Sequence, residues 1–200
     1  MINLICIFAI LSSGFQAAAQ AQAKSKTRPR KPWMQEVQLG YTIWQESIAL
    51  KNGAFETKMQ AQTQGLLANY GLSKAFSPRW VGVYGIDAAI GTLKGKGESV
   101  GIADELKGQL WYMVGLNLGV MYRTSASSAI GLHIPAHYRM IKWKLDAGSA
   151  LETERDASFS IGPGLVFENK VSDASFVRVA VTQHYQWEAT MFAFSWKYQL

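Results

Sequence analysis

The sequence predicts an all-β protein, an eight-stranded antiparallel up-and-down transmembrane β-barrel. The final stretch, 190–200, places a large apolar or aromatic residue at every second position, and seven earlier stretches repeat this period of two. Such alternation is typical of strands with two unlike faces. No stretch after residue 23 is apolar over ~18 residues, the length that a membrane-spanning helix needs. A chain of this kind can cross a membrane only as a closed barrel, which leaves no backbone group unpaired in lipid.

Turn signals or polar loops separate the expected strands. The strands cover 35–48, 56–76, 80–90, 109–122, 130–140, 159–167, 177–185 and 190–200. The connections after the second, fourth and sixth strands are short turns, whereas those after the first, third and fifth are mostly longer and polar. Bacterial transmembrane barrels show this alternation, with the short turns on the periplasmic side. The short connection after the seventh strand departs from the pattern.

The chain before the barrel is expected to have two parts. Residues 1–23 resemble a secretory signal peptide, with an early apolar run and A-x-A cleavage sites that end at Ala19, Ala21 or Ala23. Residues 24–34 are expected to form a basic, proline-containing periplasmic linker, and residues 35–200 form the barrel.

Charge and cysteine content exclude several function classes. The net charge of +6 comes mainly from five basic residues in 24–31, so the rest of the chain is close to neutral and no nucleic-acid partner is predicted. Cys6 is the only cysteine and lies in the expected signal peptide, which excludes a disulfide in the barrel. The sequence contains no phosphate-binding glycine loop and no metal-ligand cluster, so no cofactor or metal site is predicted.

The two faces of the strands are expected to meet lipid and to fill the lumen. The strand at 109–122 carries no charge on its more polar face, which favours a membrane barrel over a soluble one with an apolar interior. Eight polar residues are expected to form a lumen network: Glu46, Asp87, His133, His137, Arg139, Arg178, His184 and Lys197. Opposite charges in so narrow a space should pair, and we favour a salt-bridge plug over a proton or ion path.

Aromatic residues lie mostly near the expected strand ends. They are Trp33, Trp44, Trp80, Tyr122, Trp143, Trp187, Trp196 and Tyr198. Rings at these positions suit two interfacial girdles, and some could equally pack in the lumen. Pro135 and Pro163 each remove a backbone donor from adjacent expected strands. A local bulge is the favoured explanation, and a lateral opening between the strands is the alternative.

The signal peptide, the eight alternating strands, the short turns and the terminal run 194–200 together resemble the small outer-membrane β-barrel proteins of Gram-negative bacteria, the OmpA/OmpX/OmpW-like group. The resemblance implies location in the bacterial outer membrane, with outer-membrane lipids and lipopolysaccharide as surroundings. It also implies that the barrel-assembly machinery recognises Phe194, Trp196, Tyr198 and Leu200 as a C-terminal signal. Leu200 departs from the Phe with which this group usually ends.

Three functions follow from this resemblance. The favoured one is a structural or surface-interaction role for a filled barrel, with a possible extracellular ligand at the loops near Asn52, 94–105 and 144–157. The alternatives are a lipid A-modifying outer-membrane enzyme and a narrow, porin-like passive pore. The enzyme is disfavoured because none of the three histidines is followed two residues later by a serine, the His-x-Ser pattern of the barrel that deacylates lipid A. His184 and Glu188 could approach each other, but no serine is identified as a nucleophile for them, so no catalytic residue is predicted.

Overall fold

A computed structural model describes residues 33–52, 55–96, 109–142, 151–153 and 157–200. The strands are β1 (Met34–Asn52), β2 (Phe55–Ala75), β3 (Trp80–Lys96), β4 (Gln109–Arg123), β5 (Ser128–Lys142), β6 (Leu151–Thr153), β7 (Ala157–Ile161), β8 (Gly164–Lys170), β9 (Ser175–His184) and β10 (Ala189–Gln199). The expected signal peptide and most of the expected linker lie outside the described residues. Among the described residues, no helix is long and apolar enough to cross a membrane.

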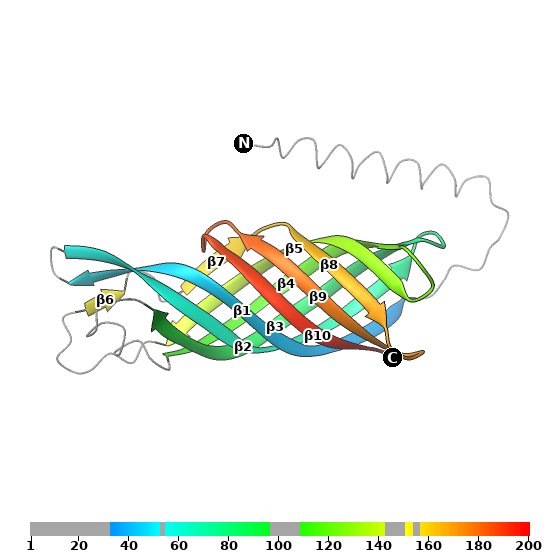
Figure 1. Cartoon of the computed structure of the whole chain (residues 1–200), viewed down its shortest axis with the longest axis horizontal. Helices are drawn as coiled ribbons and strands as arrows, with labels where there is room; N and C mark the ends of the chain where they lie inside the picture. Colours follow the sequence, from blue (N-terminus) through cyan, green and yellow to red (C-terminus); the bar gives the residue numbers. More distant parts are fainter. Residues whose placement is uncertain (1–32, 53–54, 97–108, 143–150, 154–156) are drawn as a thin grey trace, which may run out of the picture. The chain divides into compact units, whose positions relative to one another are not determined.

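The strands form one antiparallel sheet that closes on itself when β10 pairs with β1 (Figure 1). β7 and β8 both pair with β5 and together occupy one position in the wall, so the barrel has eight strand positions. The predicted fold class and strand order are confirmed. β1 begins at Met34, one residue before the expected start.

Three short turns, at 76–79, 124–127 and 171–174, lie at one end of the barrel, which we call the turn end. Serine side chains build two of them. Ser77 Oγ accepts hydrogen bonds from the Arg79 and Trp80 amides, and Ser125 Oγ accepts from those of Ser127 and Ser128. Such side-chain bonds stabilise tight turns by replacing backbone partners. The opposite end, to the left in Figure 1, is the loop end.

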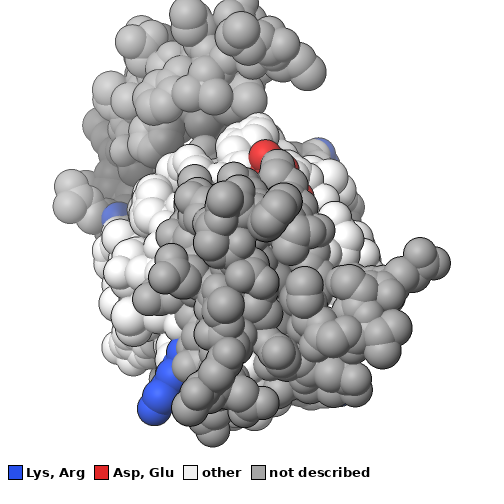
Figure 2. All heavy atoms as spheres, turned by 90° about the vertical axis from the view of Figure 1, so that its left-hand side faces the viewer, with Lys and Arg blue, Asp and Glu red and all other residues white. Residues whose placement is uncertain are grey.

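The outer face of the barrel is a continuous apolar surface. Residues such as Leu39, Leu66, Leu116 and Phe194 alternate with buried neighbours and are each more than half exposed. Few charged side chains are visible on the described flank of the barrel in Figure 2. An apolar surface of this extent would be unfavourable in water and is the surface that a transmembrane barrel presents to lipid.

The aromatic residues divide between the two faces. Trp33, Trp80, Trp196 and Tyr198 are exposed on the outer face at the turn end, and the Tyr122 ring contacts that of Trp80 at a tilted angle, so these positions fit the expected girdle. For Trp44 and Trp187 the alternative, packing in the lumen, is correct, because their side chains are buried there. Trp44 lies two residues before the inward-facing Glu46 on β1, and side chains two apart on a strand point to the same face. Trp143 lies outside the described residues.

The expected strand at 159–167 is broken into β7 and β8 by Gly162 and Pro163. The bulge explanation for the prolines is wrong, because β5 keeps the same register against β7 and β8 on either side of the break. Gly162 N–H still donates to the Pro135 carbonyl at 3.4 Å. The prolines therefore interrupt the ladder without adding a residue.

Two further departures lie at the loop end. β6 forms within the expected loop at 144–157 and pairs with the outer end of β1. β3 continues to Lys96, into the expected loop at 94–105. The rest of the loops at which a ligand was expected (53–54, 97–108, 143–150 and 154–156) lies outside the described residues.

Candidate functional site

The lumen contains many buried polar and charged side chains. All eight residues of the expected network are buried there, at 5% relative exposure or less. Glu36 and Glu168 are buried with them. Inward-facing glycines leave room for the larger rings, because a Cβ at Gly115 would collide with the His137 ring and a Cβ at Gly164 with the His133 ring.

An ion-pair cluster occupies the turn end of the lumen. Lys197 Nζ lies 2.6 Å from Glu168 Oε1 and 3.4 Å from Glu36 Oε1. Ser73 Oγ donates to the same Glu36 oxygen at 2.6 Å. The ammonium also lies 4.5 Å from the centre of the Phe176 ring. Lys197 is therefore the shared cation of two buried carboxylates, which lie on strands far apart in the sequence.

A second cluster occupies the loop end of the lumen. Arg139 forms an ion pair with Glu46, and Trp44 Nε1 and Thr63 Oγ each donate to the same carboxylate oxygen at 3.0 Å. The Arg139 guanidinium lies 4.7 Å from the centre of the Trp187 ring.

Three tryptophan rings close the lumen beside this ion pair. Trp44 contacts Trp111 edge-to-face with ring centroids 4.9 Å apart and stacks on Trp187 at 5.9 Å. Trp187 comes from the turn between β9 and β10, so this turn inserts a large ring into the loop end of the barrel. Aromatic and cationic groups packed in this way fill the lumen with side chains.

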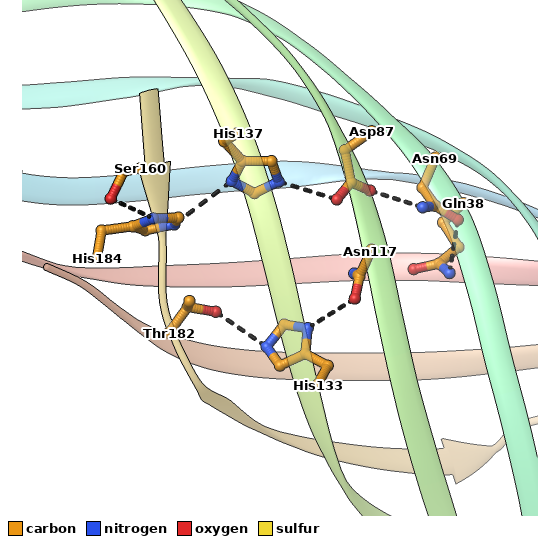
Figure 3. Close-up of polar contacts among 9 residues, drawn as sticks. All are labelled: Gln38, Asn69, Asp87, Asn117, His133, His137, Ser160, Thr182 and His184. Atoms are coloured by element: carbon orange, nitrogen blue, oxygen red, sulfur yellow. Dashed lines mark hydrogen bonds and ion pairs between the residues drawn. The ribbon is translucent and has the colours of Figure 1, made fainter. Parts of the chain in front are cut away.

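A series of polar side chains crosses the lumen between these clusters (Figure 3). Ser160 Oγ lies 3.2 Å from His184 Nδ1, and His184 Nε2 lies 3.4 Å from His137 Nδ1. His137 Nε2 lies 2.9 Å from Asp87 Oδ2. The residues come from β7, β9, β5 and β3 respectively.

The series continues beyond Asp87 through two amides. Asn69 Nδ2 donates to Asp87 Oδ1 at 2.6 Å, and Gln38 Nε2 donates to Asn69 Oδ1 at 3.0 Å. Asn69 at Oδ1 and His137 at Oδ2 together keep both oxygens of the Asp87 carboxylate hydrogen-bonded. A buried carboxylate with this many partners is held as a fixed acceptor for His137.

His133 forms a separate, shorter network. Its Nε2 lies 2.9 Å from Thr182 Oγ1 and its Nδ1 lies 3.2 Å from Asn117 Oδ1, as Figure 3 shows. Because Asn117 Oδ1 only accepts, His133 donates from Nδ1 and accepts the Thr182 hydroxyl at Nε2. Both ring nitrogens of His133 are therefore hydrogen-bonded to neighbouring lumen side chains, as expected for a structural histidine.

The wall of the barrel is not paired throughout at the loop end. β10 pairs with β1 only as far as Ile43, and the next described partner of β1 is β6, at Leu50–Asn52. β7 pairs with β5 on one side, and on its other side no described strand pairs with it. Among the described residues, β1 and β7 thus present unpaired edges beyond the short β9–β10 hairpin.

The sequence identified most of the charged lumen residues but not their partners. Glu36 and Glu168 were missed, although both have the inward parity of their strands. Ser160 was missed as a partner of His184, and Ser160 is fully buried beside it. Among the described residues, no three His, Cys, Asp or Glu side chains are placed to hold a metal ion.

No protein-family model and no curated protein matches the sequence. The fold is similar to that of Ail, the attachment invasion locus protein of Yersinia pestis, with a TM-score of 0.52 and 12% identity over 85% of this chain and 100% of that one. It is also similar to the outer membrane protein OprG from Pseudomonas aeruginosa, with a TM-score of 0.50 and 11% identity over 86% and 97% of the two chains. The chain has the closed barrel fold of small eight-stranded outer-membrane proteins.

Proposed function

We propose that this protein is an outer-membrane barrel with a closed lumen, which acts through the structure that it presents at the cell surface. One observation carries the proposal. The lumen is filled by the Lys197 cluster at the turn end and by the Arg139–Glu46 pair with its three tryptophans at the loop end. An eight-stranded barrel is just wide enough for side chains to fill it, so no continuous water-filled path is expected.

The β1–β2 hairpin supports a surface role. β1 has 19 residues and β2 has 21, whereas β9 and β10 have 10 and 11. The hairpin extends past the β9–β10 turn at the loop end in Figure 1, and β6 adds a third strand to it. In barrels of this class the end with long loops faces outside. The hairpin is therefore the element best placed to contact a surface partner.

Location and orientation can be tested with short epitope tags. A tag inserted between residues 53 and 54 should be labelled by antibody on intact cells. A tag inserted in the turn at 124–127 should be labelled only after the outer membrane is permeabilised. Both proteins should migrate differently in SDS before and after heating, as a folded barrel does. Labelling of the 124–127 tag on intact cells would contradict the proposed orientation.

The closed lumen can be tested by single-channel recording in planar bilayers. The wild-type barrel should give no conductance steps. The double variant Trp187→Ala and Trp44→Ala removes two of the three rings that close the loop end, and should give steps or fluctuating current if these rings are the barrier. Steady conductance from the wild type would contradict the closed lumen and favour the narrow passive pore.

A further inference from the structure

The free edge of β7 exposes one backbone donor to the site around Ser160. On the side away from β5, no described strand pairs with β7. The amide of Ile161, the residue after Ser160, donates instead to Gln186 Oε1 at 3.0 Å. Ser160 Oγ donates to the same amide oxygen at 2.9 Å. A carbonyl oxygen from the β9–β10 turn is therefore held by the serine and by the N–H that follows it.

One contact of this arrangement, the Ile161 N–H to a carbonyl oxygen, is also made to the substrate in a serine hydrolase. In such enzymes the backbone N–H of the residue after the nucleophile is a donor to the oxyanion. Gln186 Oε1 occupies the corresponding place beside Ser160. Trp187, stacked on His184 with ring centroids 4.4 Å apart, carries a buried indole N–H that has no hydrogen-bond partner among the described residues. A second donor thus lies near the same histidine.

One choice of tautomers for His137 and His184 lets each residue from Ser160 to Asp87 donate a hydrogen bond to the next. With His137 donating from Nε2 to Asp87, its Nδ1 accepts the Nε2–H of His184. His184 Nδ1 is then left as an acceptor for the Ser160 hydroxyl, 3.2 Å away. The single hydroxyl hydrogen serves either Gln186 or His184, so displacement of the Gln186 side chain frees it for His184. A base oriented by a further acceptor is the requirement for an activated serine.

The outer surface beside the site is apolar and continues past Ser160 to Met140 on β5. Phe159 and Ile161, on either side of Ser160, and Tyr185, next to His184, point outward and are at least 40% exposed. A tyrosine at this position is typical of a membrane–water interface. The unpaired edges of β1 and β7 lie at the same end of the barrel. A group reaching Ser160 from the side would come from the boundary between lipid head groups and acyl chains.

From this geometry we propose that Ser160 is the nucleophile of an esterase site, with His184 as general base, which takes long-chain acyl esters of membrane lipids. His137 and Asp87 are positioning residues for His184. Ser160 Oγ bonds to the ester carbonyl carbon while its proton passes to His184 Nδ1. The carbon–oxygen bond of the ester breaks, and the leaving alcohol takes that proton. Water, deprotonated by His184, then cleaves the acyl-serine to give a carboxylic acid and restores Ser160.

The β9–β10 turn is the element that must move to admit a substrate. Gln186 covers Ser160, and Glu188 in the same turn has a φ of 49°. This left-handed conformation is uncommon for a residue with a side chain. Replacement of Gln186 by Ala removes the internal carbonyl and leaves the rest of the turn in place. The Gln186→Ala variant should therefore be more reactive than the wild type.

A fluorophosphonate probe tests the nucleophile directly on the full-length barrel in detergent micelles. The serine oxygen bonds to phosphorus, fluoride leaves, and the proton passes to His184. We expect peptide mapping to place the label on Ser160 in the wild type and, at higher yield, in Gln186→Ala. The label should be lost in Ser160→Ala and slowed at least about 100-fold in His184→Gln, as expected for loss of a general base. Absence of label on Ser160 in both the wild type and Gln186→Ala overturns the proposal.

A matched control separates the nucleophile from other buried serines. Ser73 is also buried in the lumen, and its Oγ donates to Glu36 Oε1 at 2.6 Å, in the separate Lys197 cluster. Ser73→Ala should keep the wild-type label, and every variant should keep the heat-dependent shift in SDS. A label that persists in Ser160→Ala overturns the assignment.

Two further measurements test the positioning residues and the substrate class. Asp87→Asn removes the negative charge beside His137, so half-maximal labelling should move to lower pH, a change that a purely structural role would not produce. Release of fatty acid from mixed micelles of a long-chain acyl lipid by Gln186→Ala, and not by its Ser160→Ala double variant, supports the substrate class. Hydrolysis of a short soluble ester alone overturns the lipid part of the proposal.

Discussion

The turn end and the loop end of the lumen differ in what surrounds their buried charges. At the turn end, Lys197 sits between Glu36 and Glu168, and β10 pairs with β1 without a gap from Glu36 to Ile43. At the loop end, Arg139 and Glu46 lie among tryptophans, near edges of β1 and β7 that no described strand covers. The first region has the features of a structural plug. In the second, no ladder between described strands completes the wall, and a serine and two histidines lie beside it.

The comparison predicts that loss of Lys197 alone destabilises the barrel more than loss of Arg139 alone. Lys197→Met should lower the free energy of unfolding by about 5 kcal/mol, at the upper end of what removal of one buried ionic partner costs. The reason is that two carboxylates, both in a fully paired wall, lose their shared cation. Urea unfolding of the barrel in lipid vesicles, followed by tryptophan fluorescence, measures this change.

Two controls sharpen the Lys197 prediction. The triple variant Lys197→Met, Glu36→Gln and Glu168→Gln removes all three charges and should recover most of the loss, because replacement of a whole buried ion cluster is often close to neutral. Lys170→Met removes an exposed ion pair to Asp173 and should leave the unfolding midpoint unchanged. A triple variant as unstable as the single one would show that packing, and not charge, explains the effect.

Arg139→Met should destabilise the barrel less, by about 3 kcal/mol. Glu46 would keep hydrogen bonds from Trp44 and Thr63, each at 3.0 Å, so its carboxylate is not left without donors. The methionine side chain can still pack on the Trp187 ring, although the cation–π contact is lost. The same urea titration compares the two variants. A larger loss for Arg139→Met than for Lys197→Met would reverse the assignment of the structural plug to the turn end.

Period-two alternation was sufficient to predict which side chains enter the lumen. His133, His137 and Arg139 all point inward because they share one parity on β5, and the same rule applies to Asp87 on β3. Parity also assigns Trp44 to the lumen, although its position near a strand end had favoured a girdle. Trp187 lies in a turn, where parity gives no direction. Its insertion into the lumen depends on the space left by Trp44 and Trp111.

The contacts between lumen residues could not be predicted from the sequence. His137 and His184 are 47 residues apart, and Arg139 and Glu46 are 93 apart. Whether such pairs meet depends on the closure of the barrel and on the stagger of strands around it. The pairing of Ser160 with His184 further depends on the four-residue β9–β10 turn, which ends the wall at that level. Local patterns contain no information on these distances.

The smallest effect is expected from the proline that separates β7 from β8. Pro163 accepts a hydrogen bond at its carbonyl from the Gln183 amide at 3.0 Å, but it has no N–H to return to Gln183. Pro163→Ala supplies that donor and should extend the β8–β9 ladder by one bond, which contributes about 1 kcal/mol. The lost rigidity of proline in the unfolded chain offsets about 0.4–1 kcal/mol of this gain. The unfolding midpoint should therefore change little.

Amide hydrogen exchange can detect what the unfolding midpoint does not show. In Pro163→Ala, the backbone amide introduced by the substitution and the neighbouring Gln183 amide should exchange slowly, as paired amides of β8 and β9 do, whereas the amides of β7 should stay at their wild-type rates. This result would place the end of the paired wall at the β9–β10 turn, where no described strand pairs with the free side of β7. Slow exchange spreading through all of β7 would instead show that Pro163 itself keeps this edge open, and that the difference between the two ends of the barrel depends on one residue.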